Sequence, residues 1–310
     1  MSITMTLSEN RRCVPWDFAS YLPAYAAEAL AQWQPAGNTY AHEIRLRRGQ
    51  PIVIMTGRQA HFLCENHRLT GREIREVFEK ICDHSVYSYQ NELANGFVTL
   101  PGGHRVGICG TAATDSNGNR TLRYVSSINI RIANEYIGCA SSLSEAIFSR
   151  LPAGSLIVGS PGSGKTTLLR DIALSLSSSA YRQKVTVVDE RGEIAAMYRG
   201  EPQHTLGPFC DVLNGYPKGE GILIALRTLS PDVIICDEIG GEGEAEAVCE
   251  GLNAGIAIIS SIHACDADEL YRRKSFQTLR RTGAFGSLIL LKPHEIGMVN
   301  RIIEVNGHDA

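Results

Sequence analysis

A lysine and a threonine stand at the end of a glycine-rich segment and have the spacing of a phosphate-binding loop. The segment GSPGSGKTT at residues 159–167 fits the pattern G-x-x-x-x-G-K-[ST]. Glycines let successive backbone N–H groups converge on phosphate oxygens. Lys165 would then reach the β- and γ-phosphates of a nucleotide, and Thr166 would offer its hydroxyl to Mg²⁺. The nucleotide contacts expected from this pattern come from Gly159, Ser160, Pro161, Gly162, Ser163, Gly164, Lys165, Thr166 and Thr167.

Two carboxylates form the second chemical group, because Asp237 and Glu238 directly follow the apolar run at 233–236. We expect Asp237 to hold the Mg²⁺ shell beside the phosphate loop. Glu238 is then a candidate to orient or deprotonate the attacking water. An acidic pair at the start of a helix is the structural alternative, since acidic residues favour helix N-termini. The intact phosphate loop upstream favours the metal and water roles.

Further candidates follow two other apolar runs. Glu190 and Glu193 lie in VTVVDERGEI at 185–194 and could share the water-activating role, although a salt-bridged turn explains them equally well. Ser261 and His263 follow the run at 257–259, where they could sense the γ-phosphate by hydrogen bonding. A single histidine is often structural, so this role depends on its context.

These groups need an α/β scaffold to bring them together. Short apolar runs predict strands at 156–158, 185–188, 233–236 and 257–259. The strands alternate with helical patterns, which is typical of a parallel sheet with its ligands at the carboxyl ends of the strands. The helix after the phosphate loop is indicated by apolar residues at helical spacing. These are Leu168, Leu169, Ile172, Ala173 and Leu176.

The first part of the chain has a different pattern. Residues 1–140 predict an α+β domain with a sheet covered on one face, and residues 141–310 a parallel α/β domain that carries the phosphate loop, with a boundary near 138–142. Polar and apolar residues alternate at 42–47 and at 127–132, as in half-exposed strands. Thr70 has the character of a helix N-cap. His104 and Arg105 follow a glycine turn and could form a second anion contact or simply a structural hairpin.

Composition narrows the class of protein. The chain has 310 residues, 44% hydrophobic and 20% charged, with a net charge of −3, which suits a globular protein of about two domains. No apolar run approaches the ~18 residues that cross a bilayer, and the N-terminus lacks the apolar core of a signal peptide. We therefore expect the chain to stay in the cytoplasm. The nine cysteines form no C-x-x-C pair, which indicates reduced thiols used as small core residues.

Two segments of the second domain resemble the ATPase core of secretion-system traffic ATPases. They read LRTLSPDVIICDEIGG at 226–241 and AIISSIHA at 257–264. The resemblance implies a RecA-like phosphate-loop core for residues 141–310. It also implies that Glu190 and Glu193 belong to that family's acidic box and His263 to its histidine box. Gly240 and Gly241 stand where those ATPases usually have Arg-Asp, and the chain lacks the tetracysteine zinc motif of some members.

A second resemblance covers nearly the whole chain and is to the stage III sporulation protein AA family. The matching segments are EIRLRRGQP at 43–51, TLPGGHRVGICGTA at 99–112, INIRIA at 128–133, GSPGSGKTTLLRD at 159–171, VVDERGEIA at 187–195 and LSPDVIICDEIG at 229–240. It implies a cytoplasmic ATPase of endospore-forming bacteria that uses ATP and Mg²⁺. Its implied role is to energise a secretion-like channel complex between mother cell and forespore, from the inner face of the membrane.

The secretion ATPases also imply a hexameric ring in which arginines of the N-terminal domain reach a neighbouring subunit's site. Arg105 and Arg131 are the candidates here, and Arg45 and Arg47 are weaker ones, because a solvated strand face explains them equally well. A RecA-like nucleic-acid motor and a small-molecule kinase are the competing classes. Aromatic residues make up only 7% of the chain and show no interleaving with basic residues, so we expect no stable nucleic-acid partner.

Overall fold

The computed structural model describes residues 11–12, 16–34, 40–94, 96–114, 120–293 and 295–305. The chain divides into two compact units. The first, called here the phosphate-loop unit, contains Glu135–Ala196 and His204–Ala310 together with the short strand at Arg11–Arg12. The second, the N-terminal unit, contains Cys13–Asn134 and also Met197–Gln203. The division falls after Asn134, a few residues before the boundary expected from the sequence.

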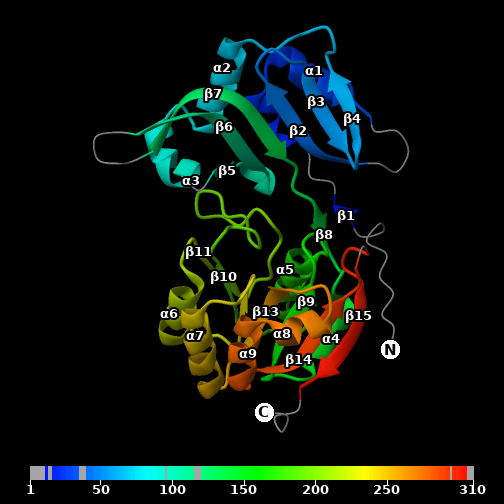
Figure 1. The fold of residues 1–310 in the computed structure, drawn as a ribbon, viewed down its shortest axis with the longest axis vertical. Coiled ribbons are helices and arrows are strands. Elements are labelled where there is room, and N and C mark those ends of the chain that lie inside the picture. Colours follow the sequence, from blue (N-terminus) through cyan, green and yellow to red (C-terminus); the bar gives the residue numbers. More distant parts are fainter. Residues whose placement is uncertain are drawn as a thin grey trace. The chain divides into compact units, whose positions relative to one another are not determined.

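A seven-stranded sheet forms the centre of the phosphate-loop unit, with strand order β11-β10-β12-β13-β9-β14-β15 (Figure 1). All neighbouring strands are parallel except the last pair. Their bounds are β9 Gly154–Gly159, β10 Val185–Asp189, β11 Cys210–Asn214, β12 Val233–Cys236, β13 Ala257–His263, β14 Phe285–Leu291 and β15 Val299–Glu304. The four predicted strands are therefore confirmed as β9, β10, β12 and β13, whereas β11, β14 and β15 were not predicted.

Helices cover both faces of this sheet, because side chains of the strands alternate between two apolar clusters. One cluster packs Ile157 and Ile235 against α4 and α5, and the other packs Leu156 and Ile234 against α6 to α9. The helix bounds are α4 Ser141–Phe148, α5 Lys165–Leu176, α6 Lys218–Thr228, α7 Glu242–Asn253, α8 Ala267–Arg272 and α9 Lys274–Arg281. The apolar stripe predicted after the phosphate loop is buried along α5.

The N-terminal unit has a six-stranded antiparallel sheet of order β4-β3-β2-β7-β6-β5 (Figure 1). Its strands are β2 Ala41–Arg47, β3 Ile52–Thr56, β4 Gln59–Leu63, β5 Phe97–Thr99, β6 Arg105–Thr114 and β7 Arg120–Arg131. Helices α1 (Ala24–Gln32) and α2 (Gly71–Ile81) pack on one face of the sheet. The short helix α3 (Gln90–Ala94) follows a 3-10 turn at Val86–Tyr89, and two more such turns lie at Asp17–Tyr21 and Pro101–Gly103.

Thr70 begins α2 as predicted. Its hydroxyl accepts a hydrogen bond from the Glu73 backbone N–H at 3.2 Å, and the Glu73 carboxylate accepts one from the Thr70 N–H at 2.8 Å. This reciprocal capping satisfies two backbone donors that the helix itself cannot. A small ladder of β1 (Arg11–Arg12) with β8 (Glu135–Tyr136) belongs to the other unit. The α/β fold with a smaller α+β unit, expected from the sequence, is confirmed.

No helix in the described parts of the chain is long and apolar enough to cross a membrane. Cys82, Cys139 and Cys236 are buried, as predicted for cysteines used in the core. Cys109 and Cys265 are exposed instead, so that prediction was wrong for these two. Within the described ranges, no group of three or more metal-ligating side chains comes together.

Candidate active site

The phosphate loop joins β9 to α5 through backbone that requires glycine. Gly164 has φ +93°, a conformation that L side chains rarely adopt. A Cβ atom on Gly164 would also lie 2.8 Å from the backbone nitrogen of Gly297. Gly297 in turn donates a hydrogen bond to the Ser163 carbonyl at 2.7 Å. The loop is therefore held by the segment before β15, and the N-terminus of α5 points its free N–H groups at the loop.

Lys165 is buried, and three protein acceptors surround its ammonium group. Its Nζ donates to the carbonyl oxygens of Gly159 at 2.9 Å and of Ser160 at 3.0 Å. The third acceptor is Nδ1 of His263, also at 2.9 Å. Burial lowers the pKa of Lys165, and the nearby negative charges of Asp237 and Glu238 oppose that shift. A phosphate group would be a stronger partner than these acceptors, because it carries full negative charge.

Thr166 and Asp237 meet although β9, which leads into the phosphate loop, and β12 are not neighbours. The Thr166 hydroxyl donates to Asp237 Oδ2 at 2.6 Å, across β13, which lies between β9 and β12. The Ser261 hydroxyl, from β13, donates to Asp237 Oδ1 and lies 3.1 Å from the Glu238 backbone N–H, which donates to it. Ser261 thus fixes the carboxylate pair, whereas the sequence suggested that it senses phosphate. A hydroxyl and a carboxylate are hard oxygen ligands of the kind that Mg²⁺ takes.

Glu238 lies at the end of a polar chain that starts at the phosphate loop. Lys165 contacts Nδ1 of His263, and Nε2 of the same ring contacts the Glu238 carboxylate. With Nδ1 accepting from the lysine ammonium group, the ring N–H lies on Nε2 and donates a hydrogen bond to Glu238. Glu238 also pairs with Arg191 at 3.3 Å and has φ +44°, which is strained for a residue with a side chain. Lys165, His263 and Glu238, chosen from separate motifs, are therefore brought together.

The acidic box forms a turn that is fixed from two sides. Asp189 is buried, and its carboxylate accepts hydrogen bonds from the backbone N–H groups of Glu193, Ile194 and Ala195 at 2.8–3.2 Å. Burial raises the pKa of Asp189, while those hydrogen bonds oppose the shift. Arg170, from α5, donates to the carbonyl oxygens of Glu193 at 2.8 Å and Ile194 at 2.9 Å. The sequence analysis missed both Asp189 and Arg170.

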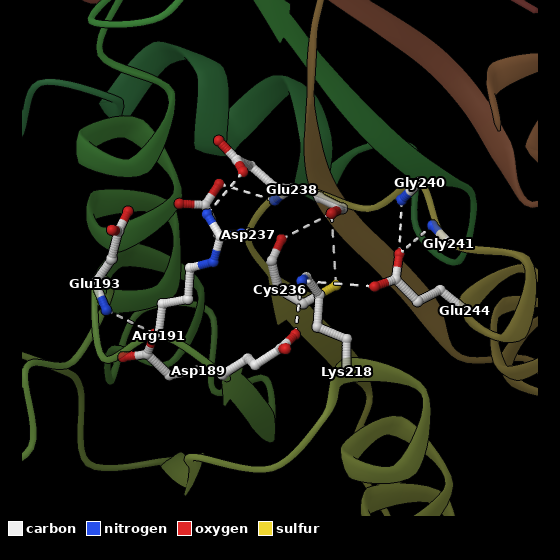
Figure 2. A network of polar contacts seen from close by, with 12 residues as sticks. Asp189, Arg191, Glu193, Lys218, Cys236, Asp237, Glu238, Gly240, Gly241 and Glu244 are labelled. Atoms are coloured by element: carbon white, nitrogen blue, oxygen red, sulfur yellow. Dashed lines mark hydrogen bonds and ion pairs between the residues drawn. The ribbon is translucent and has the colours of Figure 1, made fainter. Parts of the chain in front are cut away.

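Glu190 and Glu193 border a hollow next to Asp237 and Glu238. Figure 2 shows how the side chains of this network lie. The full lining is Asp189, Glu190, Arg191, Glu193, Lys218, Asp237 and Glu238. Lys218 was also missed by the sequence analysis, and its Nζ lies 2.7 Å from Glu190 Oε2. The ends of two strands, β10 and β12, thus supply carboxylates to one hollow.

The structure also gives a role to the glycine pair that departs from the traffic ATPases. The backbone N–H groups of Gly240 and Gly241 donate to Glu244 Oε2 at 2.6 and 2.7 Å (Figure 2). Glu244 thereby caps the start of α7. The backbone of the pair thus connects the segment after Glu238 to this helix through the Glu244 side chain.

Arg105 and Arg131 belong to the N-terminal unit and stand opposite one another on β6 and β7. On the neighbouring strand β2, Glu43 stands opposite Arg131. The Glu43 carboxylate forms an ion pair with Arg45 at 2.8 Å. The Arg105 guanidinium lies 3.8 Å from the ring centre of Phe97. Arg47 continues the same row on β2 and is exposed. The candidate arginines therefore share one face of the sheet.

Solved structures with the same architecture define the fold class. The ATPase DotB of Legionella pneumophila matches with a TM-score of 0.54 and 20% identity, covering 81% of this chain and 72% of that one. The pilus retraction motor PilT, solved with bound ADP, matches with a TM-score of 0.59 and 15% identity, covering 86% and 80%. At such identities the likeness establishes the fold, which is that of the secretion and pilus traffic ATPases.

Sequence comparison defines the family. The model of the family described as sporulation stage III, protein AA, matches residues 30–309. The stage III sporulation protein AA of Bacillus subtilis (strain 168) is 35% identical over 297 residues, which cover 94% of this chain and 96% of that protein. The chain belongs to the sporulation stage III protein AA family, as the sequence motifs predicted.

Proposed function

We propose that the protein binds ATP with Mg²⁺ at the phosphate loop and hydrolyses it to ADP and phosphate. The observation that carries this proposal is the meeting of Thr166 with Asp237 and of Lys165 with Glu238 through His263. Lys165 and Thr166 begin α5, Asp237 and Glu238 follow β12, and His263 ends β13. A phosphate-positioning cation, a pair of magnesium ligands and a carboxylate base are the parts that hydrolysis of a nucleoside triphosphate needs.

Each part has a separate task in this mechanism. The loop N–H groups and Lys165 bind the β- and γ-phosphates, while Thr166 and Asp237 hold the metal. Held by these two residues, Mg²⁺ would neutralise charge that develops on the phosphate oxygens. Glu238 orients the attacking water and accepts its proton. When Lys165 turns toward phosphate, it leaves Nδ1 of His263, so this ring links nucleotide binding to the position of the Glu238 carboxylate.

The motor is proposed to act in sporulation, on membrane-embedded components of a secretion-like channel complex. Family membership and the similarity to the Bacillus subtilis protein support this setting. The likeness to PilT, a retraction motor, supports the coupling of hydrolysis to mechanical work. We place the protein at the cytoplasmic face of the membrane, in the mother cell.

A hexameric ring with shared sites is part of the proposal. Arg105 and Arg131 stand directly opposite each other on adjacent strands, so they place two positive charges together on one face of the sheet. Glu43 lies opposite Arg131 on the neighbouring strand. In the proposed ring, these arginines would contact the terminal phosphate of a nucleotide bound to the next subunit and neutralise its transition-state charge in trans.

Lys165→Ala tests the function directly. The variant should lose ATP hydrolysis by about 10²–10³-fold or more, because the transition-state charge loses a buried donor, and it should bind nucleotide more weakly. Steady-state phosphate release and binding of a fluorescent ATP analogue measure the two effects. Lys274→Ala is the matched control, since this exposed lysine starts α9, away from the loop. Normal hydrolysis by Lys165→Ala protein would refute the proposed site.

Removal of the metal gives an independent test. Chelation of Mg²⁺ with EDTA should stop hydrolysis, and added Mg²⁺ should restore it, because Thr166 and Asp237 act through the metal. Thr166→Val keeps the shape of the side chain but removes the oxygen, so it should raise the Mg²⁺ concentration needed for half-maximal rate. Thr166→Ser keeps the oxygen and should behave like the unchanged protein. Equal metal dependence in all three proteins would exclude Thr166 as a ligand.

A further inference from the structure

We infer that Lys218 is a positioning residue of the active site, which neutralises Glu190 and leaves Glu238 as the carboxylate that works on water. This inference rests on the proposed hydrolysis of ATP. The same lysine reaches Glu244, whose other oxygen holds the backbone after Glu238. Lys218 would therefore fix both the acidic box and the segment that carries the base.

Lys218 lies at a position where a positive charge is unfavourable. It is the first residue of α6 and is nearly buried, with 10% of its side chain exposed. The N-terminus of a helix carries partial positive charge and disfavours a cation, and burial of an ammonium group costs free energy unless it is paired. A lysine is retained at such a place only where carboxylates compensate it, so its partners explain its presence.

Two carboxylates from different elements compensate this charge. Nζ of Lys218 lies 2.7 Å from Oε2 of Glu190, which directly follows β10. It also lies 3.5 Å from Oε1 of Glu244 in the first turn of α7. Figure 2 shows Lys218 and Glu244 directed toward each other. Because Oε2 of Glu244 binds the N–H groups of Gly240 and Gly241, one cation connects two segments that border the hollow.

The backbone around Lys218 packs closely against the two elements that carry its carboxylate partners. A Cβ on Gly221 would lie 2.5 Å from a methyl group of Val188 on β10. A Cβ on Gly219 would lie 3.2 Å from the carbonyl oxygen of Gly243 on α7. Glycines on either side of Glu220 thus seat the start of α6 against both elements that supply the carboxylates. The position of Lys218 is therefore determined by the packing of α6 against β10 and α7.

The ion pair with Lys218 distinguishes Glu190 from Glu238, the other candidate base. Burial works to raise the pKa of Glu190, but its hydrogen bond and charge interaction with Lys218 lower that pKa overall. A carboxylate held in its ionised form by an adjacent cation is a weak proton acceptor. Glu190 is therefore a structural counter-charge. Without Lys218 its carboxylate would lose its hydrogen-bonded cation in a hollow already lined by Asp189, Asp237 and Glu238.

Kinetics of Lys218→Met test the inference in the full-length protein. This variant keeps the length of the side chain and removes its charge. We expect kcat to fall about 10–100-fold, the usual cost of losing an outer positioning contact, while the KM for ATP changes less than about threefold. Lys218→Arg should retain most of kcat, because it preserves the charge. The thermal midpoint of each variant shows whether any loss reflects unfolding.

The double variant Lys218→Met with Glu190→Gln supplies the decisive comparison. If the lysine acts by neutralising Glu190, removal of the Glu190 charge should recover kcat at least severalfold over Lys218→Met alone. A large rise in KM without such recovery would mean that Lys218 binds phosphate directly, and would overturn the inference. Normal kcat in Lys218→Met, or complete inactivity of Glu190→Gln alone, would also overturn it. Absence of ATP hydrolysis in the unchanged protein would instead refute the proposed function.

Discussion

Replacing Arg131 or Arg105 with alanine should leave ATP binding intact and lower the hydrolysis rate by about 10³–10⁵-fold, the range known for arginines supplied in trans. Lys165 alone leaves transition-state charge on the γ-phosphate that another cation must neutralise. The two arginines stand on adjacent strands, directly opposite each other. Nucleotide binding and hydrolysis, measured on the same preparation, would separate the two effects.

Mixing subunits tests whether the arginine acts on a neighbour. Neither Arg131→Ala nor Lys165→Ala protein should hydrolyse ATP alone, but the mixture should recover part of the activity, because some interfaces then contain a complete site. Arg123→Ala is the control, since Arg123 lies on β7 beside the Tyr124 ring and is exposed. Activity per subunit should also rise with protein concentration. Full activity of a dilute monomer would exclude a shared site.

Glu238→Gln should slow hydrolysis by about 10²–10⁴-fold, the usual contribution of a general base. The amide keeps the size of the side chain and a contact with His263, but it cannot accept the proton of water. The variant should therefore retain bound ATP, which single-turnover measurements and analysis of the bound nucleotide would detect.

The same measurement on Glu190→Gln distinguishes the two candidate bases. Its loss should be much smaller, because Glu190 already faces the cation of Lys218. Normal hydrolysis by the Glu238→Gln variant, together with an inactive Glu190→Gln variant, would mean that Glu190 in the acidic box is the base. The pairing of Glu190 was invisible in the sequence, where Lys218 follows it by 28 residues.

The sequence by itself determined the parts whose chemistry is local. The phosphate loop needs only consecutive residues, and α5 is indicated by its own apolar stripe, so both could be recognised without a structure. The strands β10 and β12 are short apolar runs that end in carboxylates, because a strand buried on both faces excludes polar side chains until it reaches the edge of the sheet. Thr70 likewise marks the start of α2 through contacts within one turn.

Tertiary structure decided everything that depends on which segments become neighbours. The insertion of β13 between β9 and β12 sets Ser261 against Asp237 and His263 against Lys165. Residues 197–203 join the N-terminal unit, where Gln203 accepts a hydrogen bond from Gly102 across 101 positions of sequence.

Two of the three polar residues that sequence reasoning missed follow the same rule. Arg170 and Lys218 have no recognisable local pattern, because each is defined by carbonyl or carboxylate groups brought to it from another element. The partners of Asp189 are local instead, because its carboxylate accepts hydrogen bonds from backbone N–H groups four to six residues further along the chain. Burial makes such a pairing obligatory, since an unpaired charge or N–H group inside the protein costs more than the fold can offset. The sequence therefore specifies which chemical groups the site contains, and the packing of the sheet specifies which of them act on each other.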